Sequence, residues 1–257
     1  METVLITGAS SGIGMEYAKR FAKLGYHLVL VARRENILNE LAESLHKQYG
    51  VACDVIAADL SEPDAAKRIY QITQERNLQV DILINNAGFA TKGMLEWADY
   101  EQQHREMQVN ITAVVELTYF FIAPMAKRGK GYIINLGSAA SFNPIPYNSV
   151  YSATKAFVLS FSQSIAYEYK DKGVKVMVVC PQATDTHFFD HFNKMTGKMR
   201  TAEQVVDTTI KAMKTGKLIA PDGGISKAQS VMHHFLTRKA RVKITGNVGK
   251  KIWGKKT

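Results

Sequence analysis

Tyr151 and Lys155 stand four residues apart in a stretch with helical spacing, so their side chains share one face of the expected helix. A free phenol has a pKa of about 10 and is a weak acid and a weak base near neutral pH. A neighbouring ammonium favours the phenolate and lowers that pKa, which suits the pair to proton transfer. Ser138 follows the β-branched run before this helix, where its hydroxyl can donate a hydrogen bond to the same reacting oxygen. Taken singly, each of these residues is as well explained as a surface or turn residue.

A glycine-rich turn near the N-terminus predicts a phosphate site. Residues 7–14 read Thr-Gly-Ala-Ser-Ser-Gly-Ile-Gly and lie between a β-branched run and a stretch with helical spacing. Glycine allows the tight turn and the close approach of backbone to a pyrophosphate, and the N–H groups at the helix start attract phosphate. An ordinary turn between a strand and a helix is the alternative. The expected contacts to a dinucleotide from this turn are Gly8, Ser10, Ser11, Gly12, Ile13 and Gly14.

The choice between the two nicotinamide dinucleotides depends on the end of the second expected strand. An acidic residue there would bind the ribose 2′-hydroxyl of NAD, but Arg33 and Arg34 occupy this place. Guanidinium groups pair bidentately with phosphate and remain charged, so we expect NADP(H) rather than NAD(H). Two solvated arginines at a strand end are the alternative.

The elements that must position these residues follow one alternating pattern. Short β-branched runs alternate with longer stretches in which apolar residues return every three or four positions. The expected strands are 4–7, 27–31, 51–57, 82–85, 132–136, 174–180 and 217–220. Right-handed crossovers place helices on both faces of a parallel sheet, so the expected fold is α/β: a single Rossmann-like, doubly wound parallel sheet of about seven strands. Thr201 and Gln204 predict a capping box at the last core helix.

The chain has 257 residues and a net charge of +10, but the charge is unevenly distributed. Residues 1–226 hold 24 Lys and Arg against 23 acidic residues, whereas residues 227–257 hold nine Lys and Arg and no acidic residue. We therefore expect a catalytic domain over 1–225 and a basic C-terminal helical extension over 226–257. A nearly neutral body offers no wide phosphate-tracking surface, so nucleic acid is not an expected partner. The extension either packs on the protein or lies on an anionic membrane, and we favour packing.

Composition excludes disordered and collagen-like classes, because 46% of the residues are hydrophobic and 22% are charged. Cys53 and Cys180 are isolated in apolar runs, which predicts packing residues in a reducing compartment. The longest apolar run, near 117–125, is shorter than the roughly 20 residues of a membrane span. A β-branched run follows Met1 directly, which leaves no room for a signal peptide, so we expect a cytoplasmic protein.

The motifs taken together resemble the short-chain dehydrogenase/reductase family over about residues 3–221. The resemblance rests on the glycine turn, on Asn85-Asn86-Ala87-Gly88, and on Asn110, Ser138, Tyr151 and Lys155 in this order. It implies NAD(P) binding, carbonyl/alcohol oxidoreduction and the catalytic set Asn110, Ser138, Tyr151 and Lys155, with Asn110 ordering a proton-relay water. The cofactor contacts that it implies are Arg33, Asp59, Leu60, Asn86, Ala87, Gly88, Tyr151, Lys155, Pro181, Thr184 and Thr186. Oligomers are usual in this family, so we expect a homo-oligomer, a dimer or a tetramer, formed through the helices near 110–127 and 149–172.

The substrate region has fewer signals. Residues 185–200 interrupt the alternating pattern with five apolar side chains, Phe188, Phe189, Phe192, Met195 and Met199, which predicts a mobile lid over the site. Phe142, Ile145 and Tyr147 are candidates for the opposite wall. We expect an apolar or amphipathic carbonyl substrate, such as an acyl chain or a ring ketone. A lid that merely packs on the core is the alternative.

Two further features of this region are weighed against the family pattern. His187 and His191 have the spacing of a helical metal pair but lack further ligands, so no metal is expected. Gln182 follows Pro181 where the family usually has glycine, which predicts a changed loop near the nicotinamide. The expected function is hydride transfer between NADPH and a carbonyl or secondary alcohol. The alternative is an NADP(H)-sensing protein that keeps the fold and has no turnover.

Overall fold

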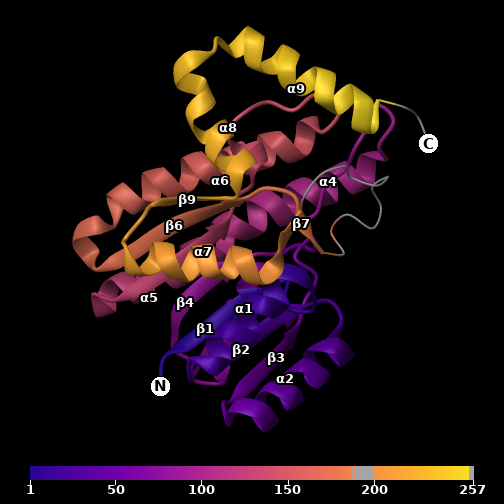
Figure 1. The fold of residues 1–257 in the computed structure, drawn as a ribbon. Coiled ribbons are helices and arrows are strands. Elements are labelled where there is room, and N and C mark those ends of the chain that lie inside the picture. Colours follow the sequence, from indigo (N-terminus) through magenta and orange to yellow (C-terminus); the bar gives the residue numbers. More distant parts are fainter. Residues whose placement is uncertain (187, 189–198, 255–257) are drawn as a thin grey trace.

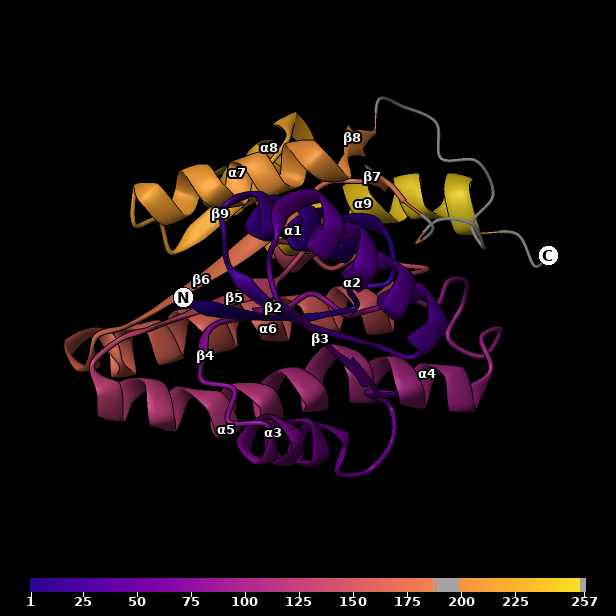
Figure 2. The same cartoon turned by 90° about the horizontal axis from the view of Figure 1, so that it is seen from below.

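The computed structural model describes residues 1–186, 188 and 199–254, which form a central sheet with helices on both faces (Figures 1 and 2). The strands are β1 (Thr3–Thr7), β2 (His27–Ala32), β3 (Cys53–Ala57), β4 (Val80–Asn85), β5 (Gly131–Leu136), β6 (Val174–Pro181), β7 (Thr184–Asp185), β8 (Arg200–Thr201) and β9 (Ile219–Asp222). The helices are α1 (Gly12–Lys23), α2 (Glu35–Tyr49), α3 (Ala65–Glu75), α4 (Tyr100–Met107), α5 (Ala113–Arg128), α6 (Ser149–Glu168), α7 (Ala202–Lys214), α8 (Gly224–Phe235) and α9 (Arg238–Trp253).

Seven strands form one parallel sheet in the order β3-β2-β1-β4-β5-β6-β9, and β7 pairs with β8 in a separate two-stranded piece. The chain order reverses between β1 and β4, so the crevice between the carboxyl ends of these strands is a topological switch point. The fold class and the seven-stranded sheet expected from the sequence are confirmed. Three expected strands begin two residues from their predicted starts: β3 at Cys53 rather than 51, β4 at Val80 rather than 82, and β9 at Ile219 rather than 217.

The apolar spacing of each helix determines which face of the sheet it covers. On one face Tyr17 and Phe21 of α1 pack with Leu38 of α2 and Val205 of α7. On the other face, α3, α5 and α6 pack on the sheet through the buried side chains of Ile69, Leu117, Phe121 and Ile165. The helix α7 begins at the expected capping box, because the Thr201 side chain accepts from the Gln204 N–H and the Gln204 side chain accepts from the Thr201 N–H.

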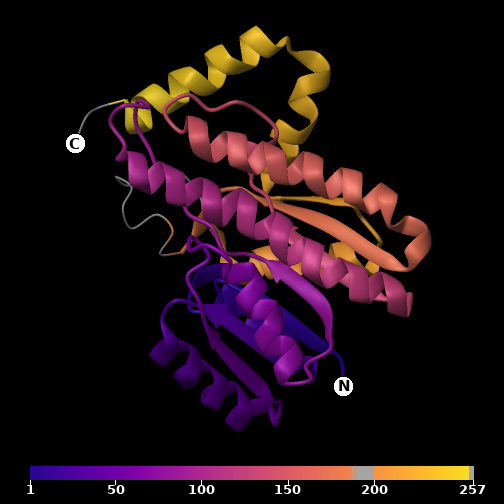
Figure 3. The same cartoon turned by 180° about the vertical axis from the view of Figure 1, so that it is seen from behind.

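The C-terminal extension is two helices rather than one, and α9 lies across the loop that precedes α6 (Figures 1 and 3). The helix α8 begins at Gly224, next to the expected domain boundary, and the Ser226 hydroxyl donates to the Cys180 carbonyl at 2.6 Å. The Thr245 hydroxyl of α9 donates to the Pro144 carbonyl at 2.7 Å, and Gly249 approaches the Pro146 carbonyl too closely for any side chain. These contacts hold the extension on the body of the protein.

The helical stretch Tyr100–Arg128 is long and apolar enough to cross a membrane by length and composition, although the apolar run near 117–125 within it is short. A π-helical turn at Gln108–Thr112 joins α4 to α5, so the stretch is 29 residues long and its most apolar window has a mean hydropathy of 1.5. Half of that window is buried in the protein, where α5 packs on α3 and the sheet. The criterion of length and composition is met equally by such core helices.

The first prediction concerns the ion pair that joins β8 to β9. Asp222 is buried, and Arg200 donates to it twice at 2.8 and 3.0 Å, beside a 2.6 Å hydrogen bond from Thr208. Arg200→Met leaves this carboxylate without its cation, so we expect the free energy of unfolding in urea to fall by about 3 kcal/mol. Arg20→Met is the control, because Arg20 pairs with the exposed Asp207 and should cost less than about 1 kcal/mol. Equal losses in the two variants would contradict the assignment.

Candidate active site

The glycine turn between β1 and α1 leaves room for a ligand and none for side chains. Gly8 and Gly12 have positive φ angles of 68° and 54°, and a Cβ on Gly14 would collide with the Gly8 carbonyl. Ser11 precedes α1 in an extended conformation, and within the described part of the chain its side chain makes no cap hydrogen bond. The first N–H groups of α1 are therefore left for a phosphate, as the turn predicts.

The segment after β4 is tied directly to this turn. The Asn86 side chain donates to the Thr7 carbonyl at 2.8 Å, and the Thr7 hydroxyl accepts from the N–H groups of Asn86 and Ala87 at 3.0 and 3.1 Å. A Cβ on Gly88 would lie 2.9 Å from Asn110 Oδ1 and 3.4 Å from Lys155 Nζ. The Asn-Ala-Gly segment thus connects the phosphate turn on one side with the expected catalytic residues on the other.

The two arginines at the end of β2 lie beside the glycine turn. Arg34 donates to the Ser10 hydroxyl at 3.0 Å and to the Ser10 carbonyl at 3.3 Å, whereas the Arg33 side chain is 71% exposed and 4.0 Å from Asp59. Ser10, Arg33 and Arg34 therefore form a cationic rim around the start of α1. Such a rim has the charge and the donors that a 2′-phosphate needs.

Asp59, expected next to the adenine, is held by its own chain. It accepts from the Ser61 N–H and hydroxyl and pairs with Arg105 at 3.0 Å. Burial works to raise the pKa of Asp59, but the Ser61 hydrogen bonds and the Arg33 and Arg105 guanidiniums outweigh it and lower that pKa. Leu60 packs against the core on the α3 side of the sheet.

The segment after β6 returns to the glycine turn from the other side. Thr184 is buried and its hydroxyl donates to the Gln182 carbonyl, while the Thr186 side chain lies 3.1 Å from the position of a Cβ on Gly12. Thr184 and Thr186 thus follow Pro181, the last residue of β6, toward the start of α1. The structure brings together both ends of the expected dinucleotide site.

Tyr151 and Ser138 meet where β5 ends and α6 begins. Their side chains are hydrogen-bonded, and the Ser138 hydroxyl also accepts from the Ala140 N–H at 3.1 Å. Lys155 is buried, donates to the Leu136 carbonyl at 2.8 Å, and lies 5.8 Å from the centre of the Tyr151 ring. The three expected catalytic side chains therefore converge at the carboxyl edge of the sheet.

In the chain alone the pKa of Tyr151 is raised, and not lowered as the neighbouring Lys155 ammonium led us to expect. Burial raises the pKa of Tyr151 to about 12 and outweighs the hydrogen bond with Ser138, which lowers it. Burial likewise lowers the pKa of Lys155 to about 8. Transferring a phenolate out of water costs more free energy than its few polar neighbours recover. The Lys155 ammonium donates its hydrogen bond to the Leu136 carbonyl.

Asn110 does lie before β5, but in the π-helical turn rather than in a regular helix. It is buried, donates to the Phe89 carbonyl at 2.9 Å and to the Thr154 hydroxyl at 3.1 Å, and accepts from the Phe89 N–H at 3.2 Å. A π-helical turn widens the helix locally and is frequent at functional sites. Here the turn places Asn110 against α6, where Asn110 donates to Thr154, the residue before Lys155.

Glu106 is a buried residue of this region that the sequence did not predict. One of its carboxylate oxygens accepts from the Thr91 N–H and hydroxyl at 2.8 and 2.6 Å, and the other has no hydrogen-bond partner among the described residues. Burial raises the pKa of Glu106, which the Thr91 hydrogen bonds and the charge of Lys155 oppose. Most of the residues around it in the chain are polar, so the sequence indicates an ordinary exposed helix.

The expected lid is partly described. The Phe188 ring lies 5.7 Å from the Tyr151 ring, centre to centre, whereas Phe189, Phe192 and Met195 lie outside the described residues. His187 and His191 also lie outside them, and the described residues contain no group of side chains that could hold a metal ion. Of the opposite wall, Phe142 packs beside Cys180. Tyr147 has the strained φ of 66°, and its carbonyl accepts from the Gly93 N–H.

The structure shows the surroundings of Gln182 and of the two cysteines. Gln182 does not take a left-handed backbone; its side chain accepts from the Ile225 N–H at 3.0 Å and so holds the start of α8. Cys180 is buried and its pKa is raised to about 12, as a packing residue requires. Cys53 is half-buried, and burial raises its pKa to about 11.

This geometry agrees with the comparison with known proteins. A family described as "short chain dehydrogenase" matches residues 2–197. The chain belongs to the short-chain dehydrogenase/reductase family. It is 34% identical over 217 residues to 17-beta-hydroxysteroid dehydrogenase type 3 of Mus musculus, with 82% of this chain and 69% of that protein covered. It is 33% identical over 216 residues to very-long-chain 3-oxoacyl-CoA reductase of the same organism, with 82% and 68% covered.

A solved structure, a short-chain dehydrogenase from Sphingobium yanoikuyae in complex with NADPH, superposes with a TM-score of 0.83 at 35% identity. The superposition covers 91% of this chain and 93% of that one. Membership of the family confirms the resemblance found in the sequence and the expectation of an oxidoreductase acting on CH–OH groups.

The second prediction concerns the cationic rim of this short-chain dehydrogenase. Arg33→Ala/Arg34→Ala removes both guanidiniums of this rim, so the dissociation constant for NADPH should rise by about 10- to 100-fold. The constant for NADH, which has no 2′-phosphate, should change little. Fluorescence titration with both dinucleotides measures this, and Lys47→Ala, an exposed lysine of α2, is the control. A parallel loss for NADPH and NADH would show that the arginines only support the fold.

Proposed function

We propose that the protein is an NADPH-dependent reductase of apolar or amphipathic carbonyl compounds, reversible as an alcohol dehydrogenase. The observation that carries the proposal is the hydrogen-bonded pair Ser138 and Tyr151, with Lys155 on the same helix face and next to the Asn-Ala-Gly segment that contacts the glycine turn. An acid for the carbonyl oxygen and a cradle for a dinucleotide thus share one edge of the sheet. The two relatives and the NADPH complex described above support the same reaction class.

The residues of the cradle fit NADP(H). Gly8, Gly12 and Gly14 leave backbone space for the pyrophosphate, and the rim of Ser10, Arg33 and Arg34 suits the 2′-phosphate. Thr184 and Thr186 lie on the side of the turn where the family pattern has its nicotinamide contacts. When bound, the dinucleotide supplies the hydride, and the protein supplies binding, orientation and protons.

The raised pKa of Tyr151 suits it to the direction of reduction. A phenol with a pKa of about 12 remains protonated at neutral pH and is a competent proton donor to a carbonyl oxygen that gains charge. The Ser138 hydroxyl accepts from Ala140, so its own proton is available to the same oxygen. Lys155, buried behind the ring, stabilises negative charge on the phenol oxygen once the proton has left, and Asn110 is the proposed relay residue.

The substrate class follows from the side chains around Tyr151. Phe188 covers the tyrosine ring from the lid, and Phe142 and Ile145 lie in the loop before α6. Apolar walls of this kind bind an acyl chain or a fused ring by the area they remove from water. The two relatives are named for a steroid and for a long acyl chain, which supports the proposal.

A sensor without turnover is a weaker candidate, because a sensor has no need of a buried Lys155 beside a hydrogen-bonded Ser138 and Tyr151. We further propose a cytoplasmic homo-oligomer. The exposed aromatic side chains of Tyr119 on α5 and of Phe157 and Tyr167 on α6 support association through these helices. The packing of α8 and α9 on the body favours an extension that supports the protein over one that lies on a membrane.

The third prediction tests catalysis directly. Tyr151→Phe removes the proton donor and keeps the ring against Phe188, so kcat for reduction of medium-chain and ring ketones with NADPH should fall by about 10³-fold. The dissociation constant for NADPH should remain within about twofold, since the glycine turn and the two arginines are unchanged. Val150→Ala, one residue away on α6, is the control. Activity that survives the loss of the hydroxyl would contradict the assignment of the acid.

The fourth prediction concerns pH. The pKa of Lys155 is lowered to about 8, so its ammonium is present below that pH and is lost as the pH rises through it, and kcat/KM for reduction should fall about tenfold per pH unit above about 8. The negative charge of Glu106 raises the pKa of Lys155, so Glu106→Gln should move the decline to lower pH. Glu101→Gln, on the exposed face of α4, should leave the profile unchanged. A rate that stays constant to pH 10 would exclude this role for Lys155.

A further inference from the structure

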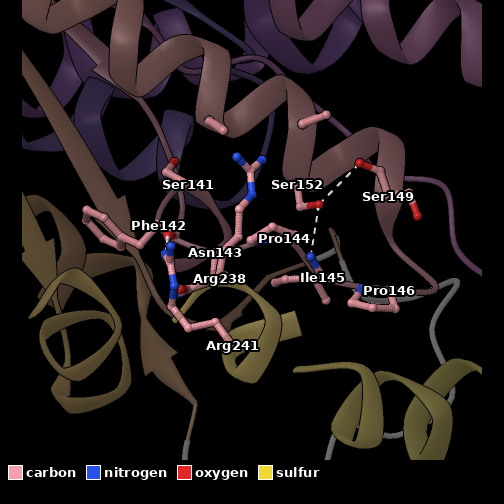
Figure 4. A pocket seen from close by; sticks show the side chains of 12 residues that line it. Ser141, Phe142, Asn143, Pro144, Ile145, Pro146, Ser149, Ser152, Arg238 and Arg241 are labelled. Carbon is pink, nitrogen blue, oxygen red and sulfur yellow. Dashed lines mark hydrogen bonds between the residues drawn. The ribbon is translucent and has the colours of Figure 1, made fainter. Parts of the chain in front are cut away.

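A cavity of about 640 Å³ opens between the loop after β5, the start of α6 and the start of α9 (Figure 4). It is adjacent to the active site but does not coincide with it. Ser149, Ala153 and Ala156 line it with one face of α6, whereas Tyr151 and Lys155 lie on another face of the same turns. Such a volume is typical of a small-molecule site.

One hydrogen bond separates this cavity from the catalytic serine. Ser141 lines the cavity, and its hydroxyl accepts from the Ser138 N–H at 3.0 Å within a single 3₁₀ turn. The loop that continues from Ser141 is held to α6 by the Ile145 N–H, which donates to the Ser152 hydroxyl (Figure 4). Ser138 and the lining of the cavity thus lie within one short turn of each other.

The charge of the cavity is one-sided. Arg238 and Arg241 reach into it from α9, and its lining contains no acidic residue (Figure 4). Arg241 donates to the Phe142 carbonyl at 3.4 Å and to the Asn143 side-chain oxygen at 3.1 Å, which are neutral acceptors. Its Nε is buried and has no hydrogen-bond partner in the described part of the chain, where neither arginine pairs with a carboxylate. Two guanidiniums without an anion form a favourable site for one.

The stability of α9 does not explain these cations. Arg238 and Lys239 are its first two residues, where the helix dipole disfavours positive charge, and its first turn contains no acidic residue. The helix is instead held by Thr237, whose side chain caps it, and by Thr245 and Gly249 against the loop before α6. The arginine at the helix start is thus available for a ligand.

The walls of the cavity specify the rest of the ligand. Apart from the arginines, serines and Asn143, its lining is apolar, with Phe142, Pro144, Ile145 and Pro146 on the loop side. We propose that this cavity binds the far end of the carbonyl substrate, and that this end carries an anionic group, a phosphate or a carboxylate, which Arg238 and Arg241 hold. The inference rests on the proposed function and assigns its substrates to the amphipathic anions.

Steady-state kinetics with three ketones distinguish the effect of an anionic group on the substrate from the effect of its acyl chain. The probes are a 3-oxoacyl coenzyme A thioester, the N-acetylcysteamine thioester of the same acyl chain, which is neutral, and a keto acid with a terminal carboxylate. In Arg238→Gln, KM for the anionic probes should rise about tenfold with kcat unchanged, and KM for the neutral thioester should not change. The matched control is Lys239→Gln, the adjacent exposed cation outside the cavity lining, which should leave all three unchanged. A tenfold rise for the coenzyme A thioester alone identifies phosphate, and one for the keto acid alone identifies carboxylate.

A binding measurement distinguishes failure of this inference from failure of the proposed function. Free coenzyme A and a medium-chain dicarboxylate are titrated calorimetrically into enzyme saturated with NADP⁺, so that the dinucleotide site cannot contribute. Binding of either probe to the wild type, weakened about tenfold in Arg238→Gln and unchanged in Lys239→Gln, supports the anion site even if no ketone is turned over. Equal effects of Arg238→Gln on neutral and anionic ketones, or binding that Arg238→Gln leaves unchanged, would overturn it.

Discussion

The active site depends on the hydrogen bonds that join the ends of β1 and β4. Thr7 ends β1, and Asn86 directly follows β4, the neighbouring strand in the sheet. The two residues are 79 apart in the chain, and the Asn86 side chain donates to the Thr7 carbonyl. The strand order reverses here, so no helix crosses this gap and the carboxyl ends remain open. These hydrogen bonds fix the start of the glycine turn to the segment that follows β4. The Asn-Ala-Gly segment then transmits that position to Asn110 and Lys155.

Burial is the second constraint, and it acts in opposite directions on the acid and the base of the site. It favours the neutral forms of Tyr151, Glu106 and Lys155, so it raises the pKa of the first two and lowers that of the third. A proton that leaves Tyr151 therefore creates a negative charge that is poorly stabilised by water. Groups that are already oriented, such as the Ser138 hydroxyl, gain importance in the same surroundings, because hydrogen bonds to charge strengthen when water is excluded.

The sequence predicted the parts of the site whose geometry is local. Four-residue spacing on a helix places Tyr151 and Lys155 together, and a glycine turn between a strand and a helix has few possible shapes. It could not predict contacts that depend on distant segments. Gln182 was expected to disturb a loop and instead caps α8, which begins 42 residues later. Glu106 lies in a mostly polar stretch of the sequence, and its burial depends on contacts with Thr91, which lies 15 residues earlier in the chain. The pKa of Tyr151 was expected to fall because the sequence shows a neighbouring charge but not the depth of burial.

In the basic extension, what a charged side chain can bind depends on its position more than on the number of charges. Exposed lysines on α9 act through solvent, where salt screens them within about 8 Å. Arg241 differs, because its Nε is enclosed and its guanidinium faces the loop that leads from Ser138 to α6. A charge in such a place interacts more strongly with any anion that enters, and its desolvation is left uncompensated until one does. The extension thus forms a wall of the cavity beside the active site, even though it lies beyond the residues that match the family.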